Sequence, residues 1–329
     1  MALNAQSFAE RLPASEQLAG IVAAGWDVGE VVDVQQVNLS ENAMYRVQAR
    51  GGNFALRLSQ PGYQSLNALR SEMHWLVQLG EQDTLRAQVV RPVQARDDGW
   101  IVGQAGWHLA LFEWIDGQKV SRDALSAKDF AALGRLSTQL THVSAQMPRP
   151  AWFERSTWSA ASFLAPHFIW GDWREHRQLS AALRRELEAV EGQVLAQLST
   201  PLNPPQLIHG DLRAANLLRR ADGTLVALDF DDCALCDPVF DLAAALSFDE
   251  ALPSLAQRAY SWIKGAQETA AGRALDWSQL PAWILLRRLS LIGWMASHPH
   301  APEAQELGAA YVAETAGLLE RLQSELRAN

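Results

Sequence analysis

The chain has 329 residues, which is long enough for two separate hydrophobic cores. Its 28 Lys and Arg residues against 37 Asp and Glu give a net charge of -9, which argues against the basic surface that non-specific nucleic-acid binding requires. No run of about eighteen apolar residues could span a bilayer, and no basic residue precedes Arg11 ahead of an apolar leader. The composition therefore predicts a cytoplasmic globular protein with no nucleic-acid and no membrane partner.

The first third of the chain is predicted to combine strands with helices. Ser15 is placed to cap a short helix that ends at Gly25. Short runs of alternating β-branched and aromatic residues predict strands over residues 31–34, 44–47 and 54–58. Ser65 is placed to cap a helix with apolar side chains on one face, which should end at Gly80. Further strands are expected over residues 89–93, 100–102 and 108–114, so this region predicts a small antiparallel lobe.

Asp116 and Gly117 break this pattern, and the rest of the chain reads as mainly helical. Helical periodicity predicts helices over residues 123–146, 176–198, 239–247, 253–270, 279–297 and 303–327. The sequence thus predicts an α+β fold in two lobes. They are an N-terminal lobe over residues 1–112, a hinge at 113–117 and a helical C-terminal lobe over 118–329.

One stretch near the middle of the chain carries a distinctive set of polar residues. A short apolar strand, Leu207-Ile208, runs into a turn that holds Asp211 and, five residues later, Asn216. A second apolar strand ends at Asp229, eighteen residues after Asp211, and Ala221-Asp222-Gly223 between the strands is a tight-turn signal. We therefore expect the two strands to pair as a hairpin.

Carboxylates and an amide that converge at strand ends suit a hard divalent cation. Mg²⁺ takes oxygen ligands, usually from one or two side chains together with the phosphates of a nucleotide. Asn216 and Asp229 are the predicted Mg²⁺ ligands, and Asp231 is a further candidate. Asp211 would then be available to receive a proton, which is the division of labour found in phosphoryl transfer.

These residues carry a resemblance to a known family. His209-Gly210-Asp211 is followed by Asn216, then by Asp229-Phe230-Asp231, and later by Asp237-Pro238-x-x-Asp241-Leu242-Ala243. In this pattern the chain resembles the aminoglycoside phosphotransferase and choline kinase family, whose fold is related to that of protein kinases. The resemblance implies an enzyme that uses ATP and Mg²⁺ and moves the γ-phosphate to an alcohol group.

The resemblance also implies a nucleotide site in the N-terminal lobe. In such families a strand Lys contacts the α and β phosphates and pairs with a helix Glu. Arg57 and Glu72, fifteen residues apart, hold these positions here. Arg keeps the positive charge but differs from Lys in geometry, and a solvated surface pair is the alternative interpretation.

Two further segments would complete that nucleotide site. The turn over residues 38–43 occupies the place of the glycine-rich loop of kinases. Backbone amides there, those of Ser40 and Asn42 among them, could cap phosphates, although a plain hairpin turn would have the same sequence. Residues 112–117 resemble the kinase hinge, where backbone groups of Glu113 and Ile115 would bind an adenine.

Three more residues near the motif receive roles from the resemblance. Arg213 stands where protein kinases often carry a basic residue facing the transferring phosphate, and a surface Arg in a turn is the alternative. His209 is interpreted as a structural residue that ties the loop together. Asp241 is predicted to accept hydrogen bonds from backbone amides of the loop, with a carboxylate at a helix N-terminus as the alternative.

The phosphate acceptor is predicted to be a small hydroxyl compound. Only eleven residues separate Asp229 from Asp241 and no A-P-E motif follows, so the platform for a protein substrate is short. Aromatic residues in the following helical region could contact an ammonium group, although packing between helices is the simpler interpretation. They are Trp152, Phe153, Trp158, Phe163, Phe168, Trp170 and Trp173.

Two other functions are compatible with the same motifs. A bacterial protein Ser/Thr kinase of the stress-response type would share them. A nucleotide-binding pseudokinase that serves as an interaction module is favoured only by the Arg at position 57. The intact set of Asp211, Asn216 and Asp229 favours an active enzyme.

Overall fold

The computed structural model describes residues 8–40, 42–299 and 301–328, and these residues form two compact units. The first unit comprises the described residues up to Gln118 together with Met147–Arg155 and Leu218–Asp231. The second comprises Lys119–Gln146, Ser156–Leu217 and the described residues from Asp232 onward. The first unit therefore takes two short segments from the region that the sequence assigns to the helical lobe.

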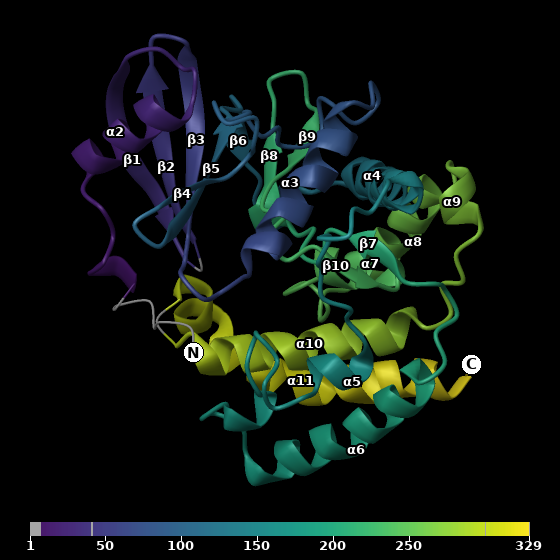
Figure 1. Ribbon diagram of the computed structural model, residues 1–329. Coiled ribbons are helices and arrows are strands. Elements are labelled where there is room, and N and C mark those ends of the chain that lie inside the picture. The colour runs from purple at the N-terminus through teal and green to yellow at the C-terminus, as the bar shows by residue number, and fades with distance from the viewer. Residues whose placement is uncertain (1–7, 41, 300, 329) are drawn as a thin grey trace. The chain divides into compact units, whose positions relative to one another are not determined.

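A five-stranded antiparallel sheet forms the centre of the first unit (Figure 1). Its strands stand in the order β1-β2-β3-β5-β4. The bounds are β1 (Val31–Leu39), β2 (Asn42–Ala49), β3 (Gly52–Ser59), β4 (Val102–Gln104) and β5 (Trp107–Glu113). The strands predicted over residues 31–34, 44–47, 54–58 and 108–114 are confirmed, because their alternating apolar residues mark a sheet with one face in a core.

The two faces of this sheet carry different side chains. Successive residues of a strand point to opposite faces, so Leu56 and Leu58 of β3 share one face and Arg57 lies on the other. The leucines join a buried apolar cluster with α2 (Ser15–Gly25), whereas Arg57 binds α3 (Leu66–Gly80). One face thus builds the core of the unit, and the other presents a charged group.

Residues 89–93 do not form the predicted strand. The amide of Val93 donates to the carbonyl of Leu111 at 2.7 Å, but Pro92 beside it has no amide hydrogen to offer. The segment therefore meets β5 at isolated positions instead of a continuous ladder. The strand predicted over residues 100–102 also shifts, because β4 begins where that range ends.

The strand before Asp211 does not pair with the strand that ends near Asp229, so the predicted hairpin of these two strands is wrong. β7 (Gln206–Ile208) pairs with β10 (Ala234–Cys236). β8 (Leu217–Arg219) stands next to β9 (Leu225–Ala227), in a small sheet of order β6-β8-β9 that includes β6 (Gln118–Lys119). Because the Asp211 loop separates β7 from β8, the tight turn at residues 221–223 joins the nearer strand, β8, to β9.

The second unit is mainly helical, as predicted. Its α-helices are α4 (Ala127–Gln146), α5 (Ala160–Phe163), α6 (Ala181–Leu198), α7 (Val239–Ala245), α8 (Leu255–Ala266), α9 (Ala270–Arg273), α10 (Leu280–Ser297) and α11 (Pro302–Ala328), and its short 3-10 turns are η1 (Arg122–Ala124), η2 (Trp173–Glu175) and η3 (Ala214–Asn216). The helix predicted from residue 176 begins at Ala181, because Ser180 caps it by accepting from the Leu183 amide at 3.1 Å. None of the described helices is long and apolar enough to cross a membrane.

Helix α10 runs through the interior of the second unit. Its residues from Leu280 to Met295 are buried around nearly the whole circumference, as expected of a helix that is apolar on all sides. Helices α6, α7 and α11 pack against it (Figure 1). Arg287 and Arg288 interrupt its apolar sequence and are buried with it, so both must find polar partners inside the protein.

Helices α4 and α8 pack with their backbones in close contact. A Cβ atom on Gly265 of α8 would lie 1.8 Å from the carbonyl oxygen of Ala131. A Cβ atom on Gly134 of α4 would lie 2.1 Å from the carbonyl oxygen of Trp262. Only glycine fits at these positions, although glycine weakens a helix interior.

We expect Gly265→Ala to lower the free energy of unfolding by about 1 to 3 kcal/mol, because α4 and α8 must move apart to admit the methyl group. Gly192→Ala on α6 is the matched control, since a Cβ atom there meets nothing within 4 Å and alanine favours a helix by up to about 1 kcal/mol. Urea unfolding of both variants measures the difference. A Gly265→Ala protein as stable as the wild type would contradict the close helix contact.

Candidate functional site

The loop that follows β7 is held by a carboxylate of α7. Gly210 has a φ of +83°, which residues with side chains rarely adopt, and a Cβ atom there would lie 2.8 Å from the carbonyl oxygen of Asp232. Asp241 of α7 accepts from the amide of Gly210 at 2.9 Å and from the amide of His209 at 3.4 Å. The predicted role of Asp241 is therefore confirmed, and its bonds fix the backbone just before Asp211.

His209 is part of the internal structure of this loop. It is fully buried, and its Nδ1 accepts from the amide of Asp211 at 3.3 Å. Burial raises the pKa of the Asp241 carboxyl, while the hydrogen bonds from the Gly210 amide, the Ser137 hydroxyl and the His209 amide oppose that rise. These contacts support the structural interpretation of His209.

The Asp211 carboxylate accepts hydrogen bonds from three side chains. Its Oδ2 accepts from Nδ2 of Asn216 at 2.7 Å and from Nε of Arg213 at 3.0 Å. Its Oδ1 accepts from Nη2 of Arg287 on α10. The structure brings together the predicted residues Asp211, Arg213 and Asn216, and it adds Arg287 to them. Arg213 therefore forms an ion pair with Asp211. The alternative interpretation, a surface Arg in a turn, did not include this contact.

Two guanidinium groups set the charge state of Asp211. Burial by itself raises the pKa of this carboxyl, but the charges of Arg213 and Arg287, with the hydrogen bond from Arg213, outweigh burial and hold the pKa at about 2. Asp211 is therefore ionised at neutral pH. Its carboxylate can orient a hydroxyl group by accepting a hydrogen bond from it.

Sequence reasoning missed Arg287, although the chain contains a signal for it. Residues 280–295 read L-P-A-W-I-L-L-R-R-L-S-L-I-G-W-M, an apolar helix interrupted by two consecutive arginines. Charged side chains are almost never fully buried unless they are paired. Two arginines in an apolar helix therefore indicate buried acidic partners. Spacing alone cannot identify those partners, because Asp211 lies 76 residues earlier in the chain.

The predicted aromatic residues divide between the two units: Trp152 and Phe153 are half-buried residues of the first unit, and the other five belong to the second. Trp158 lies edge-on to Trp170, with ring centroids 5.1 Å apart, and to Phe163, with centroids 5.2 Å apart. All three side chains are buried, which supports the packing interpretation. The cation beside them belongs to the protein itself, since the Arg287 guanidinium carbon lies 4.7 Å from the Trp170 ring centroid.

In the first unit, Arg57 and Glu72 form a buried ion pair with two hydrogen bonds. Nη1 and Nη2 of Arg57 donate to the two carboxylate oxygens of Glu72 at 2.7 and 2.6 Å. The side chains are only 4% and 1% exposed, so the interpretation as a solvated surface pair is wrong. Burial lowers the pKa of Arg57, but the charges of Glu72, Asp231 and Asp229 raise it overall. The two aspartates therefore lie within electrostatic reach of Arg57.

Asp231 is hydrogen-bonded to the first residue of β2. Nδ2 of Asn42 donates to Oδ2 of Asp231 at 2.7 Å, and Nε2 of Gln64 donates to its backbone carbonyl at 2.7 Å. The turn predicted to cap phosphates thus contacts a predicted Mg²⁺ ligand. In the same turn, the amide of Ser40 donates to the carbonyl of Asn42 at 3.0 Å, and Glu41 lies outside the described residues.

Asp229 has an unusual backbone conformation. Its φ is +60°, in the left-handed region that residues other than glycine seldom adopt, and the residue is exposed. The next residue, Phe230, is buried and packs edge-on against Trp75 of α3, with ring centroids 5.5 Å apart. Packing of Phe230 holds the strained residue in place, and such strain at an exposed carboxylate is typical of a functional site.

The predicted adenine contacts lie at the end of β5. The amide of Glu113 donates to the carbonyl of Arg91 at 2.9 Å, and its carboxylate binds the Arg91 guanidinium. The N–H group of Glu113 is therefore engaged within the first unit. Ile115 is half-buried. Binding of an adenine by Glu113 and Ile115 stays a prediction.

The oxygen donors of the motif fit a hard cation. Asn216 uses its amide nitrogen on Asp211, which leaves its amide oxygen as a ligand. In the first unit, Asp229 and Asp231 carry carboxylate oxygens of the kind that Mg²⁺ prefers. Within the described part of the chain, no cluster of three or more His, Cys, Asp or Glu side chains could hold a metal ion.

Several known proteins are similar to this chain. The model of the phosphotransferase enzyme family matches residues 33–283. The structure of a microcompartment-associated aminopropanol kinase is 30% identical, with a TM-score of 0.79 over 94% of this chain and 98% of that chain. Amicoumacin kinase hAmiN, solved with AMP-PNP, Ca²⁺ and Ami, is 18% identical, with a TM-score of 0.74 over 97% of this chain and 96% of that chain.

More distant proteins agree on the fold. Spectinomycin phosphotransferase, solved with ADP and spectinomycin, is 14% identical, with a TM-score of 0.62 over 96% of this chain and 99% of that chain. The predicted protein-kinase-like α+β fold is thereby confirmed. The uncharacterized protein sll1119 of Synechocystis sp. is 23% identical over 219 residues, which span 62% of this chain and 56% of that protein. The chain therefore matches only about half the length of this curated relative.

We expect Asp229→Gly to be more stable than Asp229→Ala by about 1 kcal/mol, because glycine adopts a positive φ without strain and alanine does not. Urea unfolding of the two variants measures the difference. The same pair of substitutions at Asp222, which is exposed and is not among the described residues of positive φ, serves as the control. An alanine variant at position 229 that equals or exceeds the glycine variant would show that the left-handed conformation is not enforced.

Proposed function

The chain belongs to the phosphotransferase enzyme family, and we propose that it moves the γ-phosphate of ATP to a hydroxyl group of a small molecule with the help of Mg²⁺. The observation that carries this proposal is the Asp211 loop. There a buried carboxylate is oriented by Asn216 and Arg213 and kept ionised. An oriented carboxylate that can accept a hydroxyl proton is the protein group that this reaction needs.

In the proposed reaction Asp211 acts on the acceptor. Its carboxylate accepts a hydrogen bond from the acceptor hydroxyl and so directs the hydroxyl oxygen at the γ-phosphorus. The oxygen forms a bond to phosphorus, the bond between phosphorus and the bridging oxygen of ADP breaks, and the hydroxyl proton passes to Asp211. Arg213, already beside this carboxylate, would stabilise charge on the transferring phosphoryl group.

The first unit would hold the nucleotide. Arg57, fixed by Glu72, would contact the α and β phosphates. Backbone groups of Ser40 and Asn42 would cap phosphate oxygens, and those of Glu113 and Ile115 would bind the adenine. The buried, two-bond Arg57–Glu72 pair supports this assignment, because it holds the guanidinium at a set position.

Mg²⁺ would be held by Asn216, Asp229 and Asp231, whose oxygen donors suit a hard cation. When bound, the ion would neutralise charge on the β and γ phosphates. Asp229 is exposed and backbone-strained, and Asp231 is oriented by Asn42. Both observations support a role for these carboxylates beyond packing.

The acceptor is proposed to be a small alcohol, and amino alcohols are the first class to examine. The similar protein with 30% identity over nearly the whole chain is an aminopropanol kinase. The similar amicoumacin and spectinomycin enzymes also act on small molecules. A protein Ser/Thr kinase of the stress-response type remains the alternative. A cytoplasmic location and the absence of nucleic-acid and membrane partners stay predictions from the sequence.

We expect ADP release from ATP and Mg²⁺ to be stimulated by one member of a panel of aminopropanol, homoserine, choline, hydroxylysine, methylthioribose and aminoglycosides. Asp211→Asn should lower the stimulated rate by about 10² to 10⁴, because the acceptor hydroxyl loses its proton acceptor. Asp222→Asn, in the exposed turn between β8 and β9, is the control and should keep full turnover.

An Asp211→Asn protein with the rate of the wild type would refute the proposed role of Asp211. Transfer of labelled phosphate to a polypeptide, and to no member of the panel, would favour the protein kinase. Nucleotide binding without turnover on either kind of acceptor would favour the pseudokinase.

A further inference from the structure

The hydrogen bonds of Asp211 leave one acceptor position on its carboxylate. A carboxylate offers about four lone-pair sites, two on each oxygen. Oδ2 uses both of its sites, on Asn216 and Arg213. Among the described residues, Oδ1 accepts only from Arg287. The second site of Oδ1 is therefore the place where a substrate hydroxyl can donate to Asp211, next to the Arg287 guanidinium.

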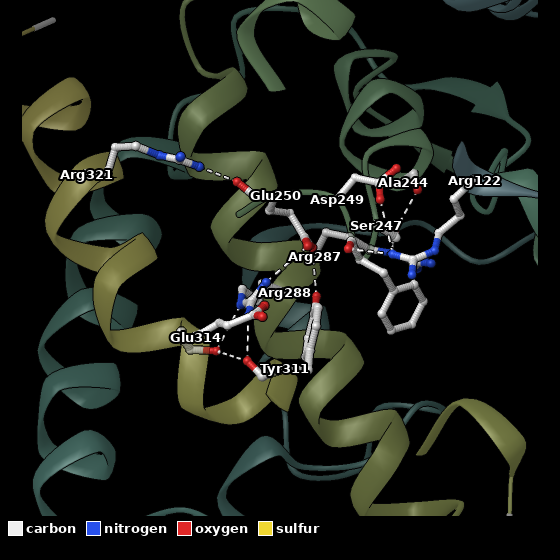
Figure 2. A network of polar contacts seen from close by, with 12 residues as sticks. Arg122, Ala244, Ser247, Asp249, Glu250, Arg287, Arg288, Tyr311, Glu314 and Arg321 are labelled. Carbon is white, nitrogen blue, oxygen red and sulfur yellow. Dashed lines mark hydrogen bonds and ion pairs between the residues drawn. The ribbon is translucent and has the colours of Figure 1, made fainter. Parts of the chain in front are cut away.

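Arg287 is itself held from several sides. Its Nε donates to Oγ of Ser247 at 2.9 Å, and that hydroxyl donates to the carbonyl of Ala244 at 2.6 Å (Figure 2). Its guanidinium also lies over the ring of Trp170. The side chain is 2% exposed. Because these contacts leave the guanidinium little freedom, the bond from Nη2 fixes the position of Oδ1.

We propose that Arg287 is the positioning residue of the transfer reaction: anchored by Ser247, it sets the plane of the Asp211 carboxylate so that Oδ1 faces the acceptor hydroxyl. The last torsion of an Asp side chain is broad, so bonds to Oδ2 alone leave the other oxygen less well fixed. A fixed oxygen pre-orders the hydroxyl for in-line attack, and a misplacement of about 1 Å can cost about 10² in rate. This inference rests on the proposed role of Asp211.

The charges around this contact come from several elements. Arg213 belongs to the Asp211 loop, and its charge and hydrogen bond lower the pKa of the Asp211 carboxyl. Glu250 follows α7. Burial raises the pKa of its carboxyl, and the charge of Arg287 acts against that rise. The guanidinium of Arg287 thus binds Asp211 directly and interacts with Glu250 through its charge.

The neighbouring Arg288 serves a different cluster and offers a matched control. Its Nη1 donates to Glu250 at 3.0 Å (Figure 2). Its Nε donates to Thr315 at 2.9 Å. Tyr311 of α11 donates to the same Glu250 at 2.7 Å. Arg288 is as buried as Arg287, at 1% exposure, but its bonds attach α11 to α10 and do not reach Asp211.

The test compares Arg287→Gln, Arg287→Lys and Arg288→Gln in steady-state kinetics with the acceptor that the wild type uses. We expect Arg287→Gln to lower kcat by about 10², with KM for the nucleotide unchanged. Arg287→Lys should recover part of kcat, because it keeps the cation but loses the planar fork that spans Ser247 and Asp211. Arg288→Gln removes a buried ion pair of the same kind, and its folded fraction should keep kcat.

Ser247→Ala covers the case in which Arg287→Gln does not fold. It removes the anchor of Nε and leaves every direct partner of Asp211 in place, so kcat should fall by about 10-fold with KM for the nucleotide unchanged. An unchanged kcat in either Arg287→Gln or Ser247→Ala would overturn the proposal. So would a higher KM with full kcat, because that pattern indicates substrate binding.

A second readout separates this inference from the proposed function. If the wild type turns over no acceptor of the panel, the proposed function fails, and crystal structures of the wild type and Ser247→Ala decide the positioning. A rotated Asp211 carboxylate in Ser247→Ala supports the role of Arg287. A carboxylate in the same plane in both proteins overturns it.

Discussion

The structure of the second unit depends on the ion pair between Asp211 and Arg287. Burial of a carboxylate and a guanidinium is unfavourable unless each group finds a partner and its hydrogen bonds. The pair meets that demand by joining α10 to the loop after β7. Ser247 and Trp170 hold the guanidinium from other sides, so Arg287 connects α10 to the Asp211 loop, to the segment after α7 and to the aromatic cluster.

The first unit solves a related problem with Arg57 and Glu72. Arg57 lies on the face of β3 opposite the apolar core, and a two-bond contact with α3 satisfies its charge. A buried guanidinium therefore joins β3 to α3 in the first unit, and another joins α10 to the Asp211 loop in the second. Because an unpaired buried charge is costly, such pairs restrict how the surrounding elements can pack, and this restriction favours a fixed site geometry.

Backbone conformation adds a second constraint at the motif. Gly210 and Asp229 both have positive φ, but the physical reasons differ. Gly210 needs its conformation because the chain passes close to Asp232, and glycine adopts it without strain. Asp229 carries a side chain in a strained position, held by the buried Phe230. The two residues therefore share a region of φ for different reasons, which are close approach of the chain at Gly210 and packing of the following residue at Asp229.

The sequence by itself determined the local features of this protein. Alternating apolar residues predicted the main strands, Ser65 predicted the start of α3, and the short spacing of Asp211 and Asn216 predicted that their side chains meet, because each depends on neighbours a few residues apart. Only the tertiary structure decided that β10 pairs with β7, that Asp211 binds Arg287 and what the aromatic residues contact. Those choices join residues far apart in the chain, and they depend on which packing satisfies every buried charge and amide at once.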